Sequence, residues 1–402
     1  MRQRGLARLQ RKHHTQTLTW VDGVGLHRWL RARRRMTLHW RAATVASLRS
    51  AVWTLLLAGC GGGHAPAGGN DGVADRPPLT ANELAVLIAE GDPISEAIAR
   101  EYQLARGIPE ANMIRVVLPT RADAIGVADF ATLKATVDIR LPAHVQATLV
   151  TWTSPSRVLG SCAMGLTSAL AFGFDARFCG GCAVTASSPI YNTSSHRPWA
   201  DHGVRPSMML GATTVAEAQT LIARGVAADG VLARTGTTGQ AWLVRTSDPD
   251  RSVRWDDFLA LARIRLPGVS MNYVDNAAGS GSNLVTGKKD VLFYFTGLAT
   301  AVQIPSNSWL PGAAADHLTS FGGMLPGGNG QMPITDWLRA GATASYGKVE
   351  EPCNYSAKFP KASVLVGRYQ RGDTLIEAYW KSVQWPGQGL FVGEPLARPW
   401  AR

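Results

Sequence analysis

The sequence predicts an α/β fold, a three-layer sandwich in which helices cover both faces of a mostly parallel sheet. Two observations lead to this prediction. Apolar runs of strand length alternate with helical patterns from residue 79 onward, which is typical of strands joined by helical crossovers. The 402 residues are 46% hydrophobic and 17% charged, which is a globular composition with room for one large domain or two smaller ones.

The first β-α-β unit covers residues 83–119. The apolar run 83–92 is interpreted as a buried strand, and residues 112–119 as the parallel strand beside it. Between them, residues 93–107 place apolar side chains on one helical face, with Gly107 and Pro109 as stop signals. The same alternation predicts strands at 146–153 and 206–213 and helices at 128–141 and 214–230.

The C-terminal half repeats the pattern. Residues 288–297, KKDVLFYFTG, are expected to form a central strand because both of its faces are apolar. We predict further strands at 240–248, 269–276 and 312–320, helices at 254–266 and 373–385, a helix and strand within 334–349, and a closing strand and loop at 389–400. Residues 156–205, rich in Ser, Gly, Cys and Pro, are interpreted as a long ordered insertion, and such loops often carry function.

The basic charge is confined to the N-terminal segment. Residues 1–59 hold twelve Lys and Arg and one acidic residue, whereas residues 60–402 hold 29 basic and 28 acidic residues. A nearly neutral body cannot rely on phosphate neutralisation for affinity. We therefore exclude nucleic acid as a partner, although the net charge of the whole chain is +12.

Residues 36–59 are expected to be a lipoprotein signal peptide. A basic segment precedes the short apolar run 51–59, and Leu57-Ala58-Gly59-Cys60 resembles the bacterial lipobox, which implies acylation of Cys60. The alternative is a plain signal peptide with an incidental cysteine. Because Met36 makes a conventional start, residues 1–35 are interpreted as an over-long start. Gly61 predicts sorting to the outer membrane, and residues 60–78 predict a flexible Gly- and Pro-rich tether.

Export decides how the remaining cysteines are interpreted. In an oxidising compartment a disulfide is the first expectation, and we predict a local one among Cys162, Cys179 and Cys182. The FCGGC stretch could instead be half of a metal site with Cys162. A closed zinc site requires four ligands, however, and the chain has only one CxxC. We therefore predict neither a metal nor a cofactor.

The stretch GAAADHLTSFGGML, residues 312–325, places Asp316, His317 and Ser320 beside a Gly-Gly turn. His317 and Ser320 could be base and nucleophile, but no GxSxG elbow presents the serine. In the other interpretation, Asp316 and Ser320 cap a following helix or turn and His317 satisfies a buried carbonyl.

Cys353 in VEEPCNY is the second candidate nucleophile, with His317 as its base on an adjacent strand. It could equally be a disulfide partner or a buried thiol. Glu350 and Glu351 beside it would raise the pKa of the thiol unless they point away. In the insertion, His196, Asp201 and His202 could hold a divalent metal with one of these glutamates, or could order the loop through hydrogen bonds.

Several motifs resemble an uncharacterised bacterial family found in species that carry exosortase, the envelope sorting system linked to exopolysaccharide. They are DPISEAIAREYQLARGIPEANMIRVVLP, YNTSSHRPWADHGVRPSMML, ADHLTSFGG, GKVEEPCN with KFP, and GDTLIEAYWKSVQWPGQGLFVGEPLARPW. The resemblance covers most of residues 79–402. It implies a cellular setting and no particular reaction.

A weaker resemblance is to the gingipain branch of caspase-like cysteine peptidases. The strand VLFYFTG, a small-residue strand, a helix, the strand ATASYGKV and the terminal GEPLARPW follow in a similar order. In those enzymes the first strand ends in His-Gly and the second in the nucleophilic cysteine. Here the first ends in Gly297-Leu298 and the second ends around Asp316 to Ser320, so neither dyad residue stands in its place.

These observations favour a catalytically inert, lipid-anchored binding or assembly domain of the envelope, facing the periplasm or the cell surface. Its partner would be an envelope protein or a polysaccharide, and Cys60 would connect it to the membrane. A pocket is expected around Asp316, Ser320 and the other polar residues of the strand ends and insertion: Glu350, Glu351, His196, Asp201 and His202. The alternative is a divergent hydrolase that is metal-assisted or uses Cys353 and His317.

Overall fold

The computed structural model describes residues 76–401, which belong to one compact unit. The predicted over-long start (1–35), the signal peptide (36–59), Cys60 and most of the tether (60–78) lie outside the described residues. Within residues 76–401, no helix combines the length and the apolar character that a membrane crossing requires.

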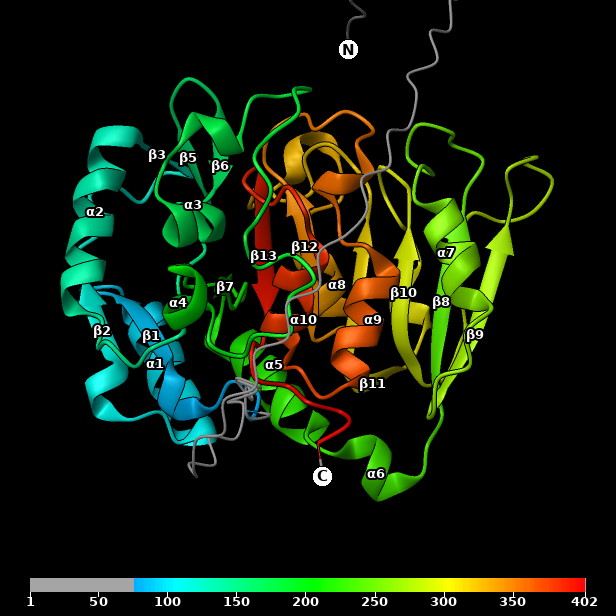
Figure 1. The fold of residues 1–402 in the computed structure, drawn as a ribbon, viewed down its shortest axis with the longest axis horizontal. Coiled ribbons are helices and arrows are strands. Elements are labelled where there is room, and N and C mark those ends of the chain that lie inside the picture. Colours follow the sequence, from blue (N-terminus) through cyan, green and yellow to red (C-terminus); the bar gives the residue numbers. More distant parts are fainter. Residues whose placement is uncertain (1–75, 402) are drawn as a thin grey trace, which may run out of the picture. The chain divides into compact units, whose positions relative to one another are not determined.

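A ten-stranded sheet forms the middle layer of the domain and confirms the predicted α/β class (Figure 1). Neighbouring strands are parallel except for the β12–β13 pair. In spatial order the strands are β2 (Met113–Val116), β1 (Leu84–Ala89), β4 (Ala147–Val150), β7 (Ser207–Met209), β13 (Gly389–Gly393), β12 (Ala344–Lys348), β11 (Trp309–His317), β10 (Val291–Thr296), β8 (Gly239–Arg245) and β9 (Val269–Asp275).

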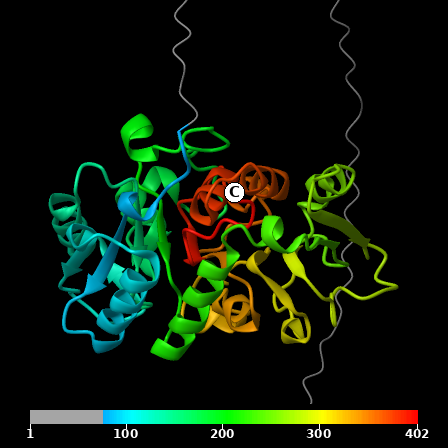
Figure 2. The same cartoon turned by 90° about the horizontal axis from the view of Figure 1, so that it is seen from below.

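Helices cover both faces of the sheet (Figure 2). One face carries α3 (Leu166–Phe172), α4 (Pro198–His202), α7 (Trp255–Ala262), α9 (Ala362–Gln370) and α10 (Leu375–Ser382). The opposite face carries α1 (Pro93–Arg106), α5 (Val215–Ala228) and α8 (Thr335–Ala340). Two further helices are α2 (Val127–Arg140) and α6 (Val231–Thr235).

The first β-α-β unit forms as predicted, and local sequence explains its boundaries. The Asp92 carboxylate accepts hydrogen bonds from the backbone N–H groups of Ile94 and Ser95, which caps α1 at its N-terminus. Gly107 ends the helix in the left-handed conformation with φ 66°, a region that suits glycine. The strands on either side of α1 are parallel, as the helical crossover requires.

The apolar strand β10 lies inside the sheet between β11 and β8, with all six residues buried, which confirms its predicted central position. The elements β10, β11, α8 and β12 follow in the order that the peptidase resemblance implies. Helix α9 was missed by the sequence patterns. The insertion 156–205 contains α3, α4 and the strands β5 (Arg157–Leu159) and β6 (Ala163–Gly165). These two strands form a small second sheet with β3 (Ala124–Gly126), which precedes the insertion.

The terminal GEPLARPW segment is fixed by a buried ion pair. Glu394 is fully buried, and its carboxylate lies 2.7 Å from the Arg106 guanidinium at the end of α1. The Tyr102 hydroxyl also donates a hydrogen bond of 2.8 Å to Glu394. These contacts connect the segment after β13 to the first helix, which accounts for the buried glutamate in this motif.

Candidate functional site

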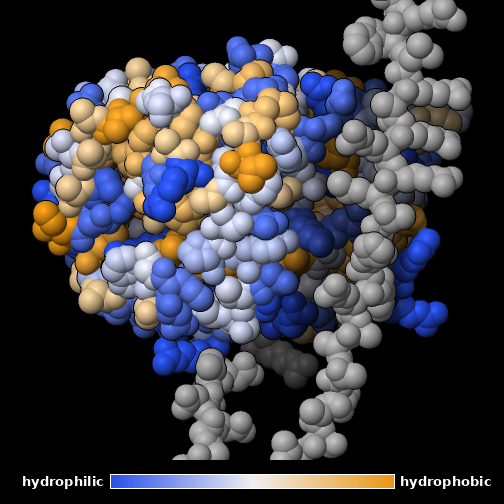
Figure 3. Space-filling model, turned by 45° about the horizontal axis from the view of Figure 1, so that its top comes forward, coloured by the Kyte–Doolittle hydropathy of each residue, from blue (hydrophilic) through white to orange (hydrophobic). Residues whose placement is uncertain are grey.

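The carboxyl ends of β8, β10, β11 and β12 meet at one edge of the sheet, because these strands are mutually parallel. A pocket of about 330 Å³ opens at this edge. It is lined by Asp250, Arg251, Leu318, Thr319, Ser320, Glu351, Pro352, Cys353 and Asn354. In the space-filling view that brings the top of the molecule forward, blue hydrophilic residues lie among tan and orange hydrophobic ones (Figure 3).

His317 is part of the packed interior and is only 1% exposed. Its Nε2–H donates to the Met332 carbonyl at 3.1 Å, and its Nδ1 accepts the indole N–H of Trp337 at 2.8 Å. Burial lowers the pKa of His317 to about 4, against the raising effect of the Met332 hydrogen bond. Both ring nitrogens are occupied, so His317 is a neutral structural residue with no nitrogen left to act as a base toward Ser320 or Cys353.

Asp316 faces the other side of the sheet, because successive strand residues alternate between faces. Its carboxylate lies 2.7 Å from the Arg254 guanidinium, and the two side chains are 1% and 3% exposed. Burial raises the pKa of Asp316, and the Arg254 charge opposes that rise. The ion-pair distance is short, yet both carboxylate oxygens lack a well-aligned hydrogen bond within the described residues. Asp316 therefore neutralises a buried arginine and does not line the pocket.

Gly297, at the end of β10, occupies a position with no room for a side chain. A β-carbon placed there would come within 1.9 Å of the Arg251 carbonyl oxygen. The loop between β8 and α7 thus fills the space beside this strand end, where the peptidase resemblance implies a catalytic histidine.

Cys353 is joined to Cys182 in a disulfide, and a second disulfide joins Cys162 to Cys179. The second bond is one of the local pairings predicted for the three clustered cysteines. Cys182 instead pairs 171 residues away. Of the alternatives for Cys353, the structure has the disulfide partner. In this state its sulfur is bonded and His317 has no free nitrogen, so the pair is not arranged as nucleophile and base.

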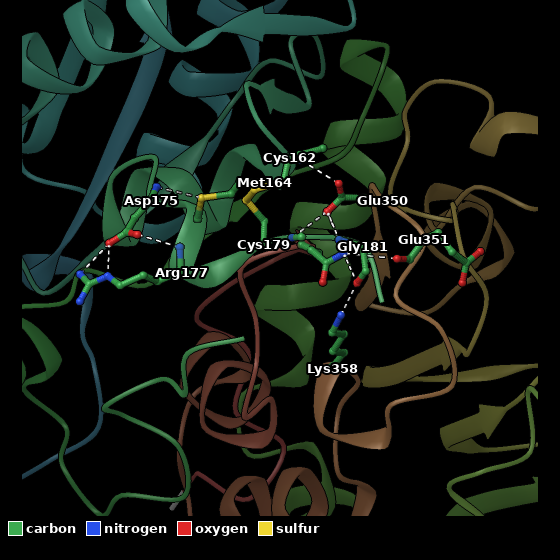
Figure 4. The surroundings of a disulfide bond; sticks show 12 residues. Cys162, Met164, Asp175, Arg177, Cys179, Gly181, Glu350, Glu351 and Lys358 are labelled. Carbon is green, nitrogen blue, oxygen red and sulfur yellow. Dashed lines mark hydrogen bonds and ion pairs between the residues drawn. A yellow bond between two sulfur atoms is a disulfide. The ribbon is translucent and has the colours of Figure 1, made fainter. Parts of the chain in front are cut away.

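The two glutamates beside Cys353 accept backbone hydrogen bonds, and Figure 4 shows the Glu350 carboxylate directed toward the segment that holds Cys179 and Gly181. The Glu350 carboxylate accepts hydrogen bonds from the N–H groups of Ala163, Gly180 and Gly181 at 3.0–3.2 Å. Glu351 accepts the N–H of Cys353 at 2.8 Å. Of the two, only Glu351 lines the pocket at the strand ends.

The predicted metal-binding set is not brought together. His196 Nδ1 lies 2.6 Å from a Glu377 carboxylate oxygen on the buried helix α10, while Asp201 accepts the Ser195 hydroxyl at 2.5 Å. His202 stays partly exposed at the end of α4. His196 and Asp201 therefore order the insertion, as the hydrogen-bond interpretation expects.

Cys182, Glu351 and Cys353 are the only group in residues 76–401 whose donor atoms lie close enough together for a metal. Both sulfur atoms are committed to the disulfide, which leaves one carboxylate, and one carboxylate does not make a metal site.

Sequence reasoning missed several residues of this edge. Arg251 and Asn354 line the pocket, while Lys358 and Gln388 bind the Gly181 carbonyl next to it. Lys358 belongs to the KFP motif. Asn354 and Gln388 also lie in motifs quoted for the resemblance, GKVEEPCN and the C-terminal motif, whereas Arg251 stands in a segment without a recognisable pattern.

Comparisons with known proteins identify no family for the chain. No family model matches it, and no curated protein matches it. A solved structure described as "Structure of Protease" is 10% identical, with a TM-score of 0.40, over 80% of this chain and 79% of that chain. A likeness this distant says nothing about activity.

Proposed function

We propose that the chain is an exported, lipid-anchored envelope protein whose α/β domain binds a partner without cleaving it. The observation that carries this proposal is the state of the two candidate catalytic residues. His317 is buried with both nitrogens hydrogen-bonded, and Cys353 is held in a disulfide. The strand-end edge therefore keeps an open pocket but lacks the predicted nucleophile and base.

The lining of the pocket favours a polypeptide segment as its occupant. Arg251 and Asp250 provide charges, Ser320 and Asn354 provide neutral donors and acceptors, and Leu318 adds apolar surface. A peptide presents the same mixture of backbone polar groups and apolar side chains. We therefore propose an envelope protein, and not a polysaccharide, as the partner.

Binding arrays of synthetic octapeptides and of neutral and acidic oligosaccharides test this assignment with labelled full-length protein. We expect octapeptide binding that weakens about tenfold in Arg251→Ala, since a charge-assisted contact is lost. Arg263→Ala, at an exposed position after α7, is the matched control and should bind as the wild type does. Binding of oligosaccharides alone would show that the partner class is wrong, and mass-spectrometric detection of cleaved octapeptides would show that the domain is an active peptidase.

The anchor and the setting are part of the same proposal. The lipobox-like LAGC, the glycine at position 61 and two disulfides in the body support export to the outer membrane. The motifs shared with the exosortase-associated family support a role beside that envelope system.

Replacing Cys60 with serine should move the protein from the membrane fraction to the soluble fraction, because the acyl chains provide the membrane affinity. Fractionation and intact mass measure this directly. A wild-type chain that is already soluble, or that carries no acyl mass, would contradict the anchor.

A further inference from the structure

Residues 179–182, here named the CGGC strap, lie beside Glu350, a residue shortly after the end of β12, and are held at both ends by disulfides. Cys179 is 5% exposed and is bonded to Cys162. At the other end Cys182 is exposed and is bonded to Cys353 beside the pocket. The strap therefore has one inner disulfide and one outer disulfide, and the outer one is accessible from solvent.

Between the two cysteines the strap is bound through its backbone. Glu350 Oε2 accepts the N–H of Gly180 at 3.2 Å and the N–H of Gly181 at 3.0 Å. The Gly181 carbonyl accepts a hydrogen bond from Lys358 Nζ (Figure 4). It also accepts one from Gln388 Nε2 at 3.1 Å. Two successive N–H groups and a carbonyl are thus satisfied by side chains from outside the strap, which is how a site recognises a peptide.

The three side chains that bind the strap are buried or partly buried and are held in place by the rest of the domain. Lys358 and Gln388 are 0% and 1% exposed, and they come from the segments before α9 and β13. Glu350 is fixed independently of the strap, because its other oxygen accepts the Ala163 N–H at 3.2 Å. Gln388 also donates to Glu350 at 2.9 Å, while its own Oε1 has no hydrogen-bond partner among the described residues. We call these three side chains the Glu350 slot.

The slot selects glycine through backbone conformation. Gly180 has φ 135° and Gly181 has φ 55°, both in the region that favours glycine. Space is not the reason, since a β-carbon on either residue would meet nothing closer than 3.7 Å. An occupant from another chain would need the same pair of conformations.

We propose that the CGGC strap is a redox-released occupant of a peptide site: reduction of Cys182–Cys353 frees the strap, and a Gly-Gly segment of a partner protein takes its place in the Glu350 slot. This inference rests on the proposed binding function and adds its regulation and its sequence preference. The slot adjoins the strand-end pocket, because Cys353 and Glu351 belong to the pocket while Glu350 belongs to the slot.

The release step is a thiol–disulfide exchange with an external dithiol. A thiolate of the dithiol attacks the exposed Cys182 sulfur, the S–S bond breaks, and Cys353 leaves as a thiolate. The second thiol of the reductant then displaces Cys182 from the mixed disulfide. Cys182 and Cys353 end as thiols and the dithiol ends as a disulfide, so two electrons pass to the protein.

Graded dithiothreitol treatment of the native full-length protein, followed by alkylation and peptide mapping, tests the release. We expect Cys182 and Cys353 to become labelled at a reductant concentration about tenfold below that needed for Cys162 and Cys179, because exposed disulfides exchange more readily. Simultaneous reduction of both bonds, or earlier reduction of the inner one, would overturn the proposal. This experiment uses the wild-type protein, so a variant that fails to fold cannot affect its result.

Fluorescence anisotropy with a labelled peptide of residues 178–184, both cysteines replaced by serine, tests the slot. The full-length receptor carries Cys182→Ser and Cys353→Ser to remove the outer disulfide, and Gly180→Ala and Gly181→Ala to weaken its own strap. We expect binding at least about tenfold tighter than to the oxidised wild type, and a tenfold loss on adding Glu350→Gln. The same peptide with Ala-Ala in place of Gly-Gly is the matched control and should not bind.

Equal binding to the oxidised wild type, or equal binding of the Ala-Ala peptide, would overturn the slot assignment. If the octapeptide arrays still show Arg251-dependent binding, only the strap inference has failed. If the arrays show peptide cleavage or no peptide binding, the proposed function itself has failed.

Discussion

Replacing Arg254 with methionine should lower the free energy of unfolding by about 3–5 kcal/mol, because the change leaves a buried carboxylate without its charge partner. Arg254 and Asp316 are 3% and 1% exposed and their charged atoms are 2.7 Å apart. Arg254 also donates to the carbonyls of Thr296 and Pro360, so its loss leaves acceptors unsatisfied as well. Urea unfolding at pH 7 measures the effect.

The double variant Arg254→Met with Asp316→Leu separates the ion pair from packing. Removing both charges should destabilise the protein less than removing Arg254 alone, because no charge is then left buried and unpaired. In Arg254→Met the pKa of Asp316 is raised by burial without opposition, so the folded state binds the proton more readily. Its stability deficit should therefore shrink as the pH falls from 7 toward 4. A loss of stability below about 1 kcal/mol in Arg254→Met would contradict this account. So would a double variant whose loss equals the sum of the losses in the two single variants.

Acidification from pH 6.5 to about 4 should cost the wild type about 3 kcal/mol through His317 alone. In the unfolded chain this imidazole takes up a proton near pH 6.5, whereas in the folded protein burial keeps it neutral down to about pH 4. Between these values the unfolded state binds more protons, so lowering the pH favours unfolding.

The variant His317→Gln should lose this part of the pH dependence, although it is less stable than the wild type at pH 7. Urea unfolding at several pH values between 7 and 4 compares the slopes. His202→Gln is the matched control, since it removes a partly exposed histidine at the end of α4 and should keep the slope. An unchanged slope in His317→Gln would mean that His317 is accessible to protons, which its described hydrogen bonds do not allow.

The fold class and the position of the candidate site could be predicted from the sequence because both depend on local patterns. The apolar runs and the helical spacing identify β10 and α1, and strand alternation implies that Asp316 and His317 point to opposite faces. Helix α9 was missed because its sequence, ASVLVGRYQ, mixes β-branched residues with a glycine, and its helical form depends on packing against α7 and α10.

The chemistry of the site could not be predicted because it depends on contacts between distant segments. Cys353 pairs with a cysteine 171 residues away, and no spacing rule reveals that partner. Glu350 looked like a neighbour that would perturb the Cys353 thiol, yet it binds the backbone of Gly180 and Gly181. Such side chain–backbone contacts leave no residue-type pattern in the sequence.

The proposal that the strand-end edge is catalytically inert is tested most directly by the thiol state of Cys353. Full-length protein isolated without reductant would be treated with iodoacetamide at graded pH, and its cysteines would be mapped by mass spectrometry under non-reducing conditions. The account predicts that Cys353 is recovered bonded to Cys182 and is not alkylated at any pH that leaves the fold intact. Rapid labelling of Cys353 alone, with an apparent pKa well below about 8.5, would mark an activated thiolate and contradict it.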